Sequence, residues 1–129
     1  MFSSGKEGSD PKMAQIWKLL DESGVDIVVV GHAHDHERFA RQDYAGGADR
    51  NSIREFVVGT GGRNLQPFSN VEPNSEVRDD HTRGVLKLTL HTTSYDWDFV
   101  PEPGATFRDS GSGECAGPGT KHAPNAAPY

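Results

Sequence analysis

Two histidines separated by a single residue are the groups in this chain best suited to chemistry. They occur in Gly31-His32-Ala33-His34, directly after the apolar run Ile27-Val28-Val29-Val30. Such a β-branched run predicts a buried strand, and side chains on the loop after it can turn toward one point outside the sheet edge. Imidazole is a ligand for zinc, iron, manganese and nickel, and a His-x-His pair can give one ligand to each of two neighbouring metals. The sequence therefore predicts His32 and His34 as metal ligands, with hydrogen-bonded loop histidines as the alternative.

Two ligands do not complete a hydrolytic metal centre, which needs three or more protein groups per metal. Asp35 could orient one of the imidazoles, or it could be an exposed loop residue. His36 extends the pattern to His-x-His-x-His, which resembles the His-x-His-x-Asp-His motif of the metallo-β-lactamase fold. The register does not match, because Asp35 precedes His36 and position 37 is Glu. That fold is kept as a minor alternative.

A helix followed by a strand must position the histidine loop. Asp10 and Pro11 suit an N-cap and a first helical position, and the helix should end at Gly24. Its buried face is predicted from apolar residues at helical spacing, which are Met13, Ile16, Trp17 and Leu20. The strand at residues 27–30 hardly alternates, so we expect it to be covered on both faces. A helix leading into a buried strand indicates an α/β layer.

Three further strands are predicted, over residues 53–58, 85–90 and 95–100. The short polar link between the last two favours an antiparallel hairpin. After the first of them, Gly59-Thr60-Gly61-Gly62 suggests a phosphate-cradling loop, but the P-loop spacing is absent, so a tight turn is the favoured interpretation. We expect one folded unit over residues 1–110 and a flexible, disordered tail rich in Gly, Pro and Ala over residues 111–129.

Composition narrows the possible partners. The chain has 129 residues, 33% of them apolar, which is lean for a self-contained domain and suggests a fragment. Its net charge of −6, without a basic cluster, disfavours binding to nucleic acid or to an anionic membrane surface. No apolar stretch is long enough to span a membrane, and the first residues lack the apolar core of a signal peptide. If the mature protein is exported, we expect its signal to lie upstream.

With the residues that follow the two histidines, the stretch from Gly31 to Phe39 resembles the last motif of the calcineurin-like metallophosphoesterases, the superfamily that includes purple acid phosphatases. Other stretches resemble the C-terminal half of bacterial members and fall in the expected order. In this chain they are Phe2-Ser3-Ser4-Gly5, the helix with Trp17, Gly24-Val25-Asp26, Phe56-Val57-Val58-Gly59-Thr60-Gly61-Gly62, Ser75-Glu76-Val77-Arg78, Gly84-Val85-Leu86-Lys87-Leu88 and Ser94-Tyr95-Asp96-Trp97. The resemblance spans roughly residues 1–113.

The resemblance implies the C-terminal part of a four-layer α/β/β/α sandwich. It also implies that His32 and His34 bind different metals of a dinuclear centre, with Fe, Zn or Mn as the candidate ions. The family typically has Tyr where this chain has His36, so His36 is expected to pack or hydrogen-bond rather than coordinate. Glu37 and Arg38 match a common Glu-Arg pair and are expected to support the loop. The implied activity is metal-dependent hydrolysis of a phosphoester by a phosphatase or phosphodiesterase.

The family's other ligands come from upstream motifs of the types Asp-x-His, Gly-Asp-x-x-Asp and Gly-Asn-His-Asp/Glu, and from a histidine shortly before a Ser-Ser-Gly segment. None of these occurs in the chain, which opens at Met1 just before Ser3-Ser4-Gly5. We therefore expect a fragment that lacks the N-terminal half of the domain and has little or no turnover alone. The competing hypothesis is a non-catalytic, β-rich binding or accessory domain that uses no metal.

Overall fold

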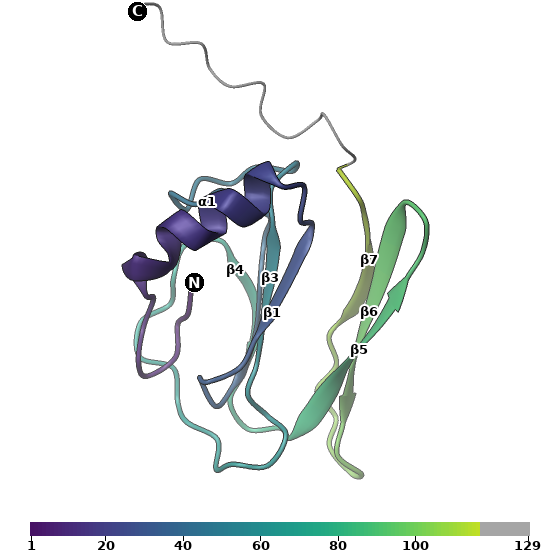
Figure 1. Ribbon diagram of the computed structural model, residues 1–129. Coiled ribbons are helices and arrows are strands. Elements are labelled where there is room, and N and C mark those ends of the chain that lie inside the picture. The colour runs from purple at the N-terminus through teal and green to yellow at the C-terminus, as the bar shows by residue number, and fades with distance from the viewer. Residues whose placement is uncertain (117–129) are drawn as a thin grey trace, which may run out of the picture.

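A short helix lies across one face of a sheet whose other face packs on a second sheet (Figure 1). The structure is a computed structural model, and it describes residues 1–116. Asp10 accepts a hydrogen bond from the backbone N–H of Lys12, and this cap starts the 3-10 turn η1 (Pro11–Met13), which leads into α1 (Ala14–Glu22). The predicted helix is therefore confirmed. Within the described residues, no helix has the length and apolar character needed to cross a membrane.

The buried face of α1 is narrower than its pattern predicts. Trp17 is buried, and the other buried helix residue is Asp21, one turn later. The side chains of Met13 and Ile16 are exposed despite their helical spacing, and Leu19 is 63% exposed. Trp17 packs edge-on against Phe2, with ring centroids 5.8 Å apart, and Asp21 accepts a hydrogen bond from the Ser52 hydroxyl at 2.9 Å.

The first sheet contains β1 (Ile27–Val30), β2 (His36–Phe39), β3 (Arg54–Val58) and β4 (Ser75–Asp79). Its strand order is β1-β3-β2-β4; β1 and β3 are parallel, and the other pairs are antiparallel. The strand predicted over residues 53–58 is β3, whereas β2 and β4 were not expected as strands. Because β1 and β3 run in the same direction, their carboxyl ends meet at one end of the sheet, where the histidine loop begins.

The second sheet contains β5 (Gly84–Leu90), β6 (Ser94–Pro101) and β7 (Ser110–Glu114), in that order, and both pairs are antiparallel. The predicted hairpin is confirmed as β5 and β6. The tail predicted from residue 111 does not begin there, because residues 110–114 form β7. The rest of that tail, residues 117–129, lies outside the described residues.

Glycines facing aromatic rings explain why β7 looks like a linker in the sequence. Gly111 pairs with Trp97 and Gly113 with Tyr95 across the β6–β7 ladder. A Cβ at Gly111 would lie 2.5 Å from the Trp97 ring, and one at Gly113 would lie 2.4 Å from the Tyr95 ring. The alternating Ser and Gly therefore make a strand whose inner positions leave room for two large rings.

Two clusters of apolar side chains hold the three layers together. Phe56, Tyr95 and Trp97 fill the space between the sheets, and Phe39 and Val57 face the helix side, where Phe2 packs against them. Among the described residues the layers are helix, sheet and sheet, so the chain has mixed sheets with few helices. No helix of residues 1–116 provides the fourth layer of the expected sandwich.

The strand β1 is less covered than predicted. It lies at the edge of its sheet, and Val29 is 48% exposed. Val29 and Ile27 line an apolar cleft of about 360 Å³ between β1 and the β5–β6 hairpin, where Leu88 and Leu90 form the opposite side. Among residues 1–116, the β-branched run therefore forms a strand with one unpaired edge and a partly exposed face.

Candidate metal centre

The loop that carries His32 and His34 leaves the carboxyl end of β1 and leads directly into β2. His32 has a φ of 74°, a left-handed conformation that is uncommon for a residue with a side chain. His32 is exposed and His34 is half-buried, while Ala33 between them is buried against Phe39 and Val57. The loop thus anchors itself through Ala33 and presents two imidazoles at the surface.

The ring of His34 is oriented by a backbone carbonyl. Its Nδ1 lies 3.1 Å from the carbonyl oxygen of Asn64, which only accepts hydrogen bonds, so Nδ1 carries the proton and donates it. In the neutral imidazole this leaves the lone pair on Nε2. A hydrogen bond from the other ring nitrogen to a carbonyl is the arrangement that metal-bound histidines usually show.

The loop after β3 holds the histidine loop in place. Gly59 N–H donates to the Asp35 carbonyl at 2.9 Å, and Gln66 N–H donates to the His34 carbonyl at 3.0 Å. A Cβ at Gly59 would lie 1.8 Å from the carbonyl oxygen of Ala33, so the two loops approach too closely for any other residue. The sequence indicated a tight turn here, and the close contact with Ala33 is the reason for its first glycine.

The two imidazoles suit metal coordination but do not form a complete site by themselves. Within residues 1–116, no group of three or more His, Cys, Asp or Glu side chains is arranged to hold a metal ion. These two side chains meet the needs of a metal ion in part: the hydrogen bond to Asn64 leaves His34 Nε2 available, and His32 makes no hydrogen bond to residues 1–116. Any further ligands for a metal ion would have to come from outside residues 1–116.

Asp35 is neither an exposed loop residue nor a partner of an imidazole, the two roles considered for it. Its side chain is fully buried, and neither carboxylate oxygen has a hydrogen-bond partner among the described residues. Burial, reinforced by the nearby charges of Glu37 and Asp80, raises the pKa of Asp35 to about 7. A Cβ at Gly5 would lie 2.6 Å from one of its oxygens, so the N-terminal segment closes tightly over this carboxyl group.

Glu37 ties the N-terminal segment to the start of β4. Its carboxylate accepts hydrogen bonds from the backbone N–H of Ser4 at 2.8 Å, from the Ser4 hydroxyl at 2.5 Å and from the Ser75 hydroxyl. Because Glu37 is fully buried, these donors replace the water that its charge loses on folding. Glu37 therefore joins the N-terminal segment to β4, and its expected support of the histidine loop stays a prediction.

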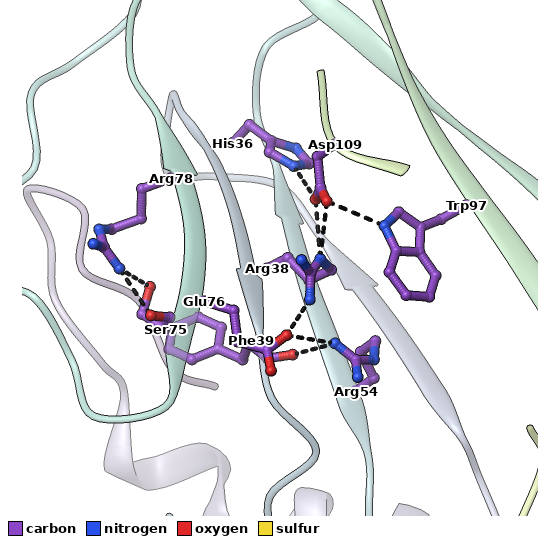
Figure 2. A network of polar contacts seen from close by, with 9 residues as sticks. All are labelled: His36, Arg38, Phe39, Arg54, Ser75, Glu76, Arg78, Trp97 and Asp109. Carbon is purple, nitrogen blue, oxygen red and sulfur yellow. Dashed lines mark hydrogen bonds and ion pairs between the residues drawn. The ribbon is translucent and has the colours of Figure 1, made fainter. Parts of the chain in front are cut away.

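A buried carboxylate, Asp109, connects the two sheets beside the histidine loop (Figure 2). It lies 3.0 Å from His36 Nε2, accepts hydrogen bonds from Arg38 Nε at 3.1 Å and accepts one from Trp97 Nε1 at 3.2 Å. His36 also packs against Phe99, with ring centroids 4.5 Å apart. The expectation that His36 packs and hydrogen-bonds is confirmed.

The charge of Asp109 is stabilised in this position. Burial raises its pKa, but the hydrogen bond from His36, the charge of Arg38 and the hydrogen bond from Trp97 together outweigh burial, so the net shift of the Asp109 pKa is downward. The sequence did not identify this residue, because it stands in a Gly- and Pro-rich stretch without periodicity. Its partners His36 and Arg38 are about 70 residues away along the chain.

Two arginines of the first sheet pack on one ring of the second. The guanidinium of Arg38 lies 5.0 Å from the Trp97 ring centroid and that of Arg54 lies 5.1 Å from it. Both arginines also pair with Glu76 (Figure 2). Each guanidinium group thus pairs with the Glu76 carboxylate on one side and stacks on the Trp97 ring on the other. These contacts join the first sheet to the second.

Comparison with known proteins identifies relatives of one kind. No family model matches the chain. Probable inactive purple acid phosphatase 1 of Arabidopsis thaliana is 35% identical over 83 residues, which are 56% of this chain and 13% of that protein. Probable inactive purple acid phosphatases 24 and 27 of the same plant are each 32% identical over 98 residues, 66% of this chain and 16% of each relative.

Comparison of the fold with solved structures also finds a purple acid phosphatase. The structure of purple acid phosphatase PPD1 from yellow lupin (Lupinus luteus) seeds superposes with a TM-score of 0.69 and 22% identity, covering 87% of this chain and 23% of that one. The chain thus spans 13–16% of the length of its curated relatives and about a quarter of the lupin protein. The proteins to which this chain is similar are thus purple acid phosphatases, of the calcineurin-like metallophosphoesterase superfamily, and the similarity covers one part of such a protein.

Proposed function

We propose that this chain supplies two metal ligands, His32 and His34, to the dinuclear centre of a metallophosphoesterase that cleaves phosphomonoesters or phosphodiesters. The observation that carries the proposal is the hydrogen bond from His34 Nδ1 to the Asn64 carbonyl, which leaves Nε2 available as a ligand. The positions of both histidines at the carboxyl end of a parallel strand pair support it, because α/β sheets bind ligands there.

Fe, Zn or Mn ions are the metals such a centre would take, and when bound they would supply Lewis acidity to the phosphoester. The chain's own residues present and orient the ligands. Ala33 anchors the loop, the Asn64 carbonyl selects the tautomer of His34, and the Glu37 carboxylate fixes the segment around Ser4 behind it. The proposed role of these groups is to hold two imidazoles in place before the metals arrive.

The remaining ligands come, in this proposal, from the other part of the domain, docked on the edge formed by β1. Three observations support that occupant. The strand has one unpaired edge although it belongs to a parallel pair, a type of pairing that is usually covered. Val29 and Leu90 are 48% and 72% exposed beside an apolar cleft. The matched region covers only 13–16% of the curated relatives. The docked part would also supply the fourth layer of the sandwich.

Zinc binding by the 129-residue chain tests the metal role. Zinc is titrated calorimetrically into the wild-type chain and into His32→Ala and His34→Ala, and the imidazole ¹⁵N shifts of His34 are followed by NMR. We expect weak, reversible binding in the wild type, a loss of about tenfold or more in affinity for each variant, and a shift of Nε2 but not Nδ1. We expect no phosphatase turnover from the chain alone.

His91→Ala is the matched control, because His91 is a partly exposed histidine on the β5–β6 hairpin. Its zinc affinity should equal that of the wild type. Equal zinc binding by the wild type and by both His32→Ala and His34→Ala would contradict the metal role. That result would favour the alternative of a non-catalytic binding or accessory domain, which is also consistent with the word inactive in the names of the plant relatives.

A further inference from the structure

Two glycines in the loop after β3 have no explanation within the protein. A Cβ added at Gly61 or Gly62 would meet no atom within 4 Å, and neither residue has the positive φ that favours glycine. Gly59 is different, because its space is taken by Ala33. Glycine also allows a ligand to approach the backbone closely, and the open space at both positions would permit such an approach.

The backbone in this stretch has free hydrogen-bond donors. Within the part of the chain that the structure describes, the N–H groups of Gly61, Gly62 and Arg63 donate to no protein acceptor, and all three residues are exposed. Successive backbone N–H groups can form an anion-binding concavity where the loop turns them toward one point. The loop therefore has backbone N–H groups available to an oxyanion, although its sequence lacks the glycine spacing of a P-loop.

Two arginines are neighbours in sequence of the residues that join this loop to the start of β5. Arg63 follows the two glycines, and Arg83 immediately precedes Gly84, whose backbone is joined to Thr60. The Thr60 hydroxyl donates to the Gly84 carbonyl at 2.8 Å, and Gly84 N–H points to the Thr60 carbonyl at 3.4 Å. Both arginine side chains are exposed, and across residues 1–116 neither has an ion-pair partner.

The loop is also attached to the candidate metal centre, since Asn64, which follows Arg63, accepts the hydrogen bond from His34. We propose that Gly61, Gly62 and Arg63, together with Arg83, form an oxyanion subsite that binds a phosphate group beside His34. The inference deepens the proposed function and rests on it for the identity of the ligand, because the phosphate would belong to the same substrate. Guanidinium groups and backbone N–H groups are the donors that suit phosphate oxygens.

Pyrophosphate binding to the full, metal-free chain tests the subsite. With a chelator present and at low ionic strength, ¹H–¹⁵N spectra are recorded during a pyrophosphate titration of the wild type, Arg63→Gln, Arg83→Gln and Gly62→Ala. We expect the amide signals of residues 61–63 to shift, and the affinity to fall about tenfold in Arg63→Gln, the loss of one hydrogen bond to a charged group. Gly62→Ala should fold normally, because the added methyl group has open space, and should also bind more weakly.

Lys87→Gln is the charge-matched control, since Lys87 is an exposed cation on β5. An equal loss of affinity in Lys87→Gln and Arg63→Gln, or unshifted amides at residues 61–63, would overturn the subsite. A separate zinc titration of the same proteins, without chelator or pyrophosphate, keeps the two proposals apart. Pyrophosphate binding without histidine-dependent zinc binding would overturn only the metal role, and zinc binding without pyrophosphate binding would overturn only the subsite.

Discussion

Replacing Asp35 by Asn should stabilise the protein at neutral and alkaline pH. The Asp35 carboxyl group is fully buried and has no hydrogen-bond partner among the described residues, and the charges of Glu37 and Asp80 act against its ionisation. An asparagine has nearly the same shape, carries no charge and has an NH₂ group that the two neighbouring carboxylates would attract. The substitution therefore removes an unfavourable charge without leaving a cavity.

The size of the effect follows from the pKa of Asp35, which rises from its ordinary value of 3.8 to about 7 in the folded protein. Over that pH range the folded protein keeps a proton that the unfolded chain has released, so the contribution of Asp35 to stability is greatest below pH 4 and falls as the pH rises to 7. The full rise corresponds to a ceiling of about 4 kcal/mol. Since the buried amide will be only partly hydrogen-bonded, we expect Asp35→Asn to gain about 2 kcal/mol at pH 8.

Urea unfolding followed by the fluorescence of the buried Trp17 and Trp97 measures this gain, with a chelator present. The difference in unfolding free energy between Asp35→Asn and the wild type should be small at pH 4.5 and reach its full value at pH 8. Asp98→Asn, a change of the same kind at an exposed position on β6, should show no such dependence. The reasoning is refuted if Asp35→Asn is less stable than the wild type at pH 8, or if the difference is the same at both pH values.

Two other expected outcomes concern the sheet connection and the open edge. Asp109→Asn should destabilise the protein by about 3 kcal/mol at pH 7, because it removes the buried negative charge that pairs with Arg38. This cost should shrink as the pH falls below 3.8, where wild-type Asp109 also becomes protonated. Urea unfolding at pH 7 and pH 3 measures this, and an equal cost at both values would contradict it. A hydrophobic dye should bind the chain strongly at β1, and Val29→Ser together with Leu90→Ser should reduce its fluorescence; a chain that binds no dye would contradict the docking of a further domain part there.

Periodic patterns in the sequence were sufficient for the helix, for β3 and for the β5–β6 hairpin. The helix has apolar residues three and four positions apart, β5 and β6 have them at alternate positions, and β3 ends an apolar run at a glycine-rich turn. The strands β2 and β4 were missed because their stability comes from contacts between distant parts of the chain. The residues of β2 are mostly polar, and His36, Glu37 and Arg38 become buried only when Asp109, Ser4 and Glu76 satisfy them.

Only the part of the candidate site that lies in one short stretch of sequence could be predicted. The spacing of His32 and His34 after an apolar run identified the loop. The contact that makes His34 a plausible ligand depends on Asn64, 30 residues away, and no local pattern indicates a backbone carbonyl as its partner. The state of Asp35 was also beyond local reasoning, because its burial depends on how the N-terminal segment around Gly5 closes over it.

The glycines of β7 have a consequence for where this domain can be divided. A boundary drawn by composition at residue 110 would remove the strand that covers Tyr95 and Trp97, and it would leave Asp109 at a chain end. The rings of Trp97 and Tyr95 fit because Gly111 and Gly113 opposite them have no side chains. A substitution at either glycine therefore requires a matching substitution of the ring opposite it. A larger residue at position 111 or 113 is compatible with this sheet only where the ring opposite has become smaller.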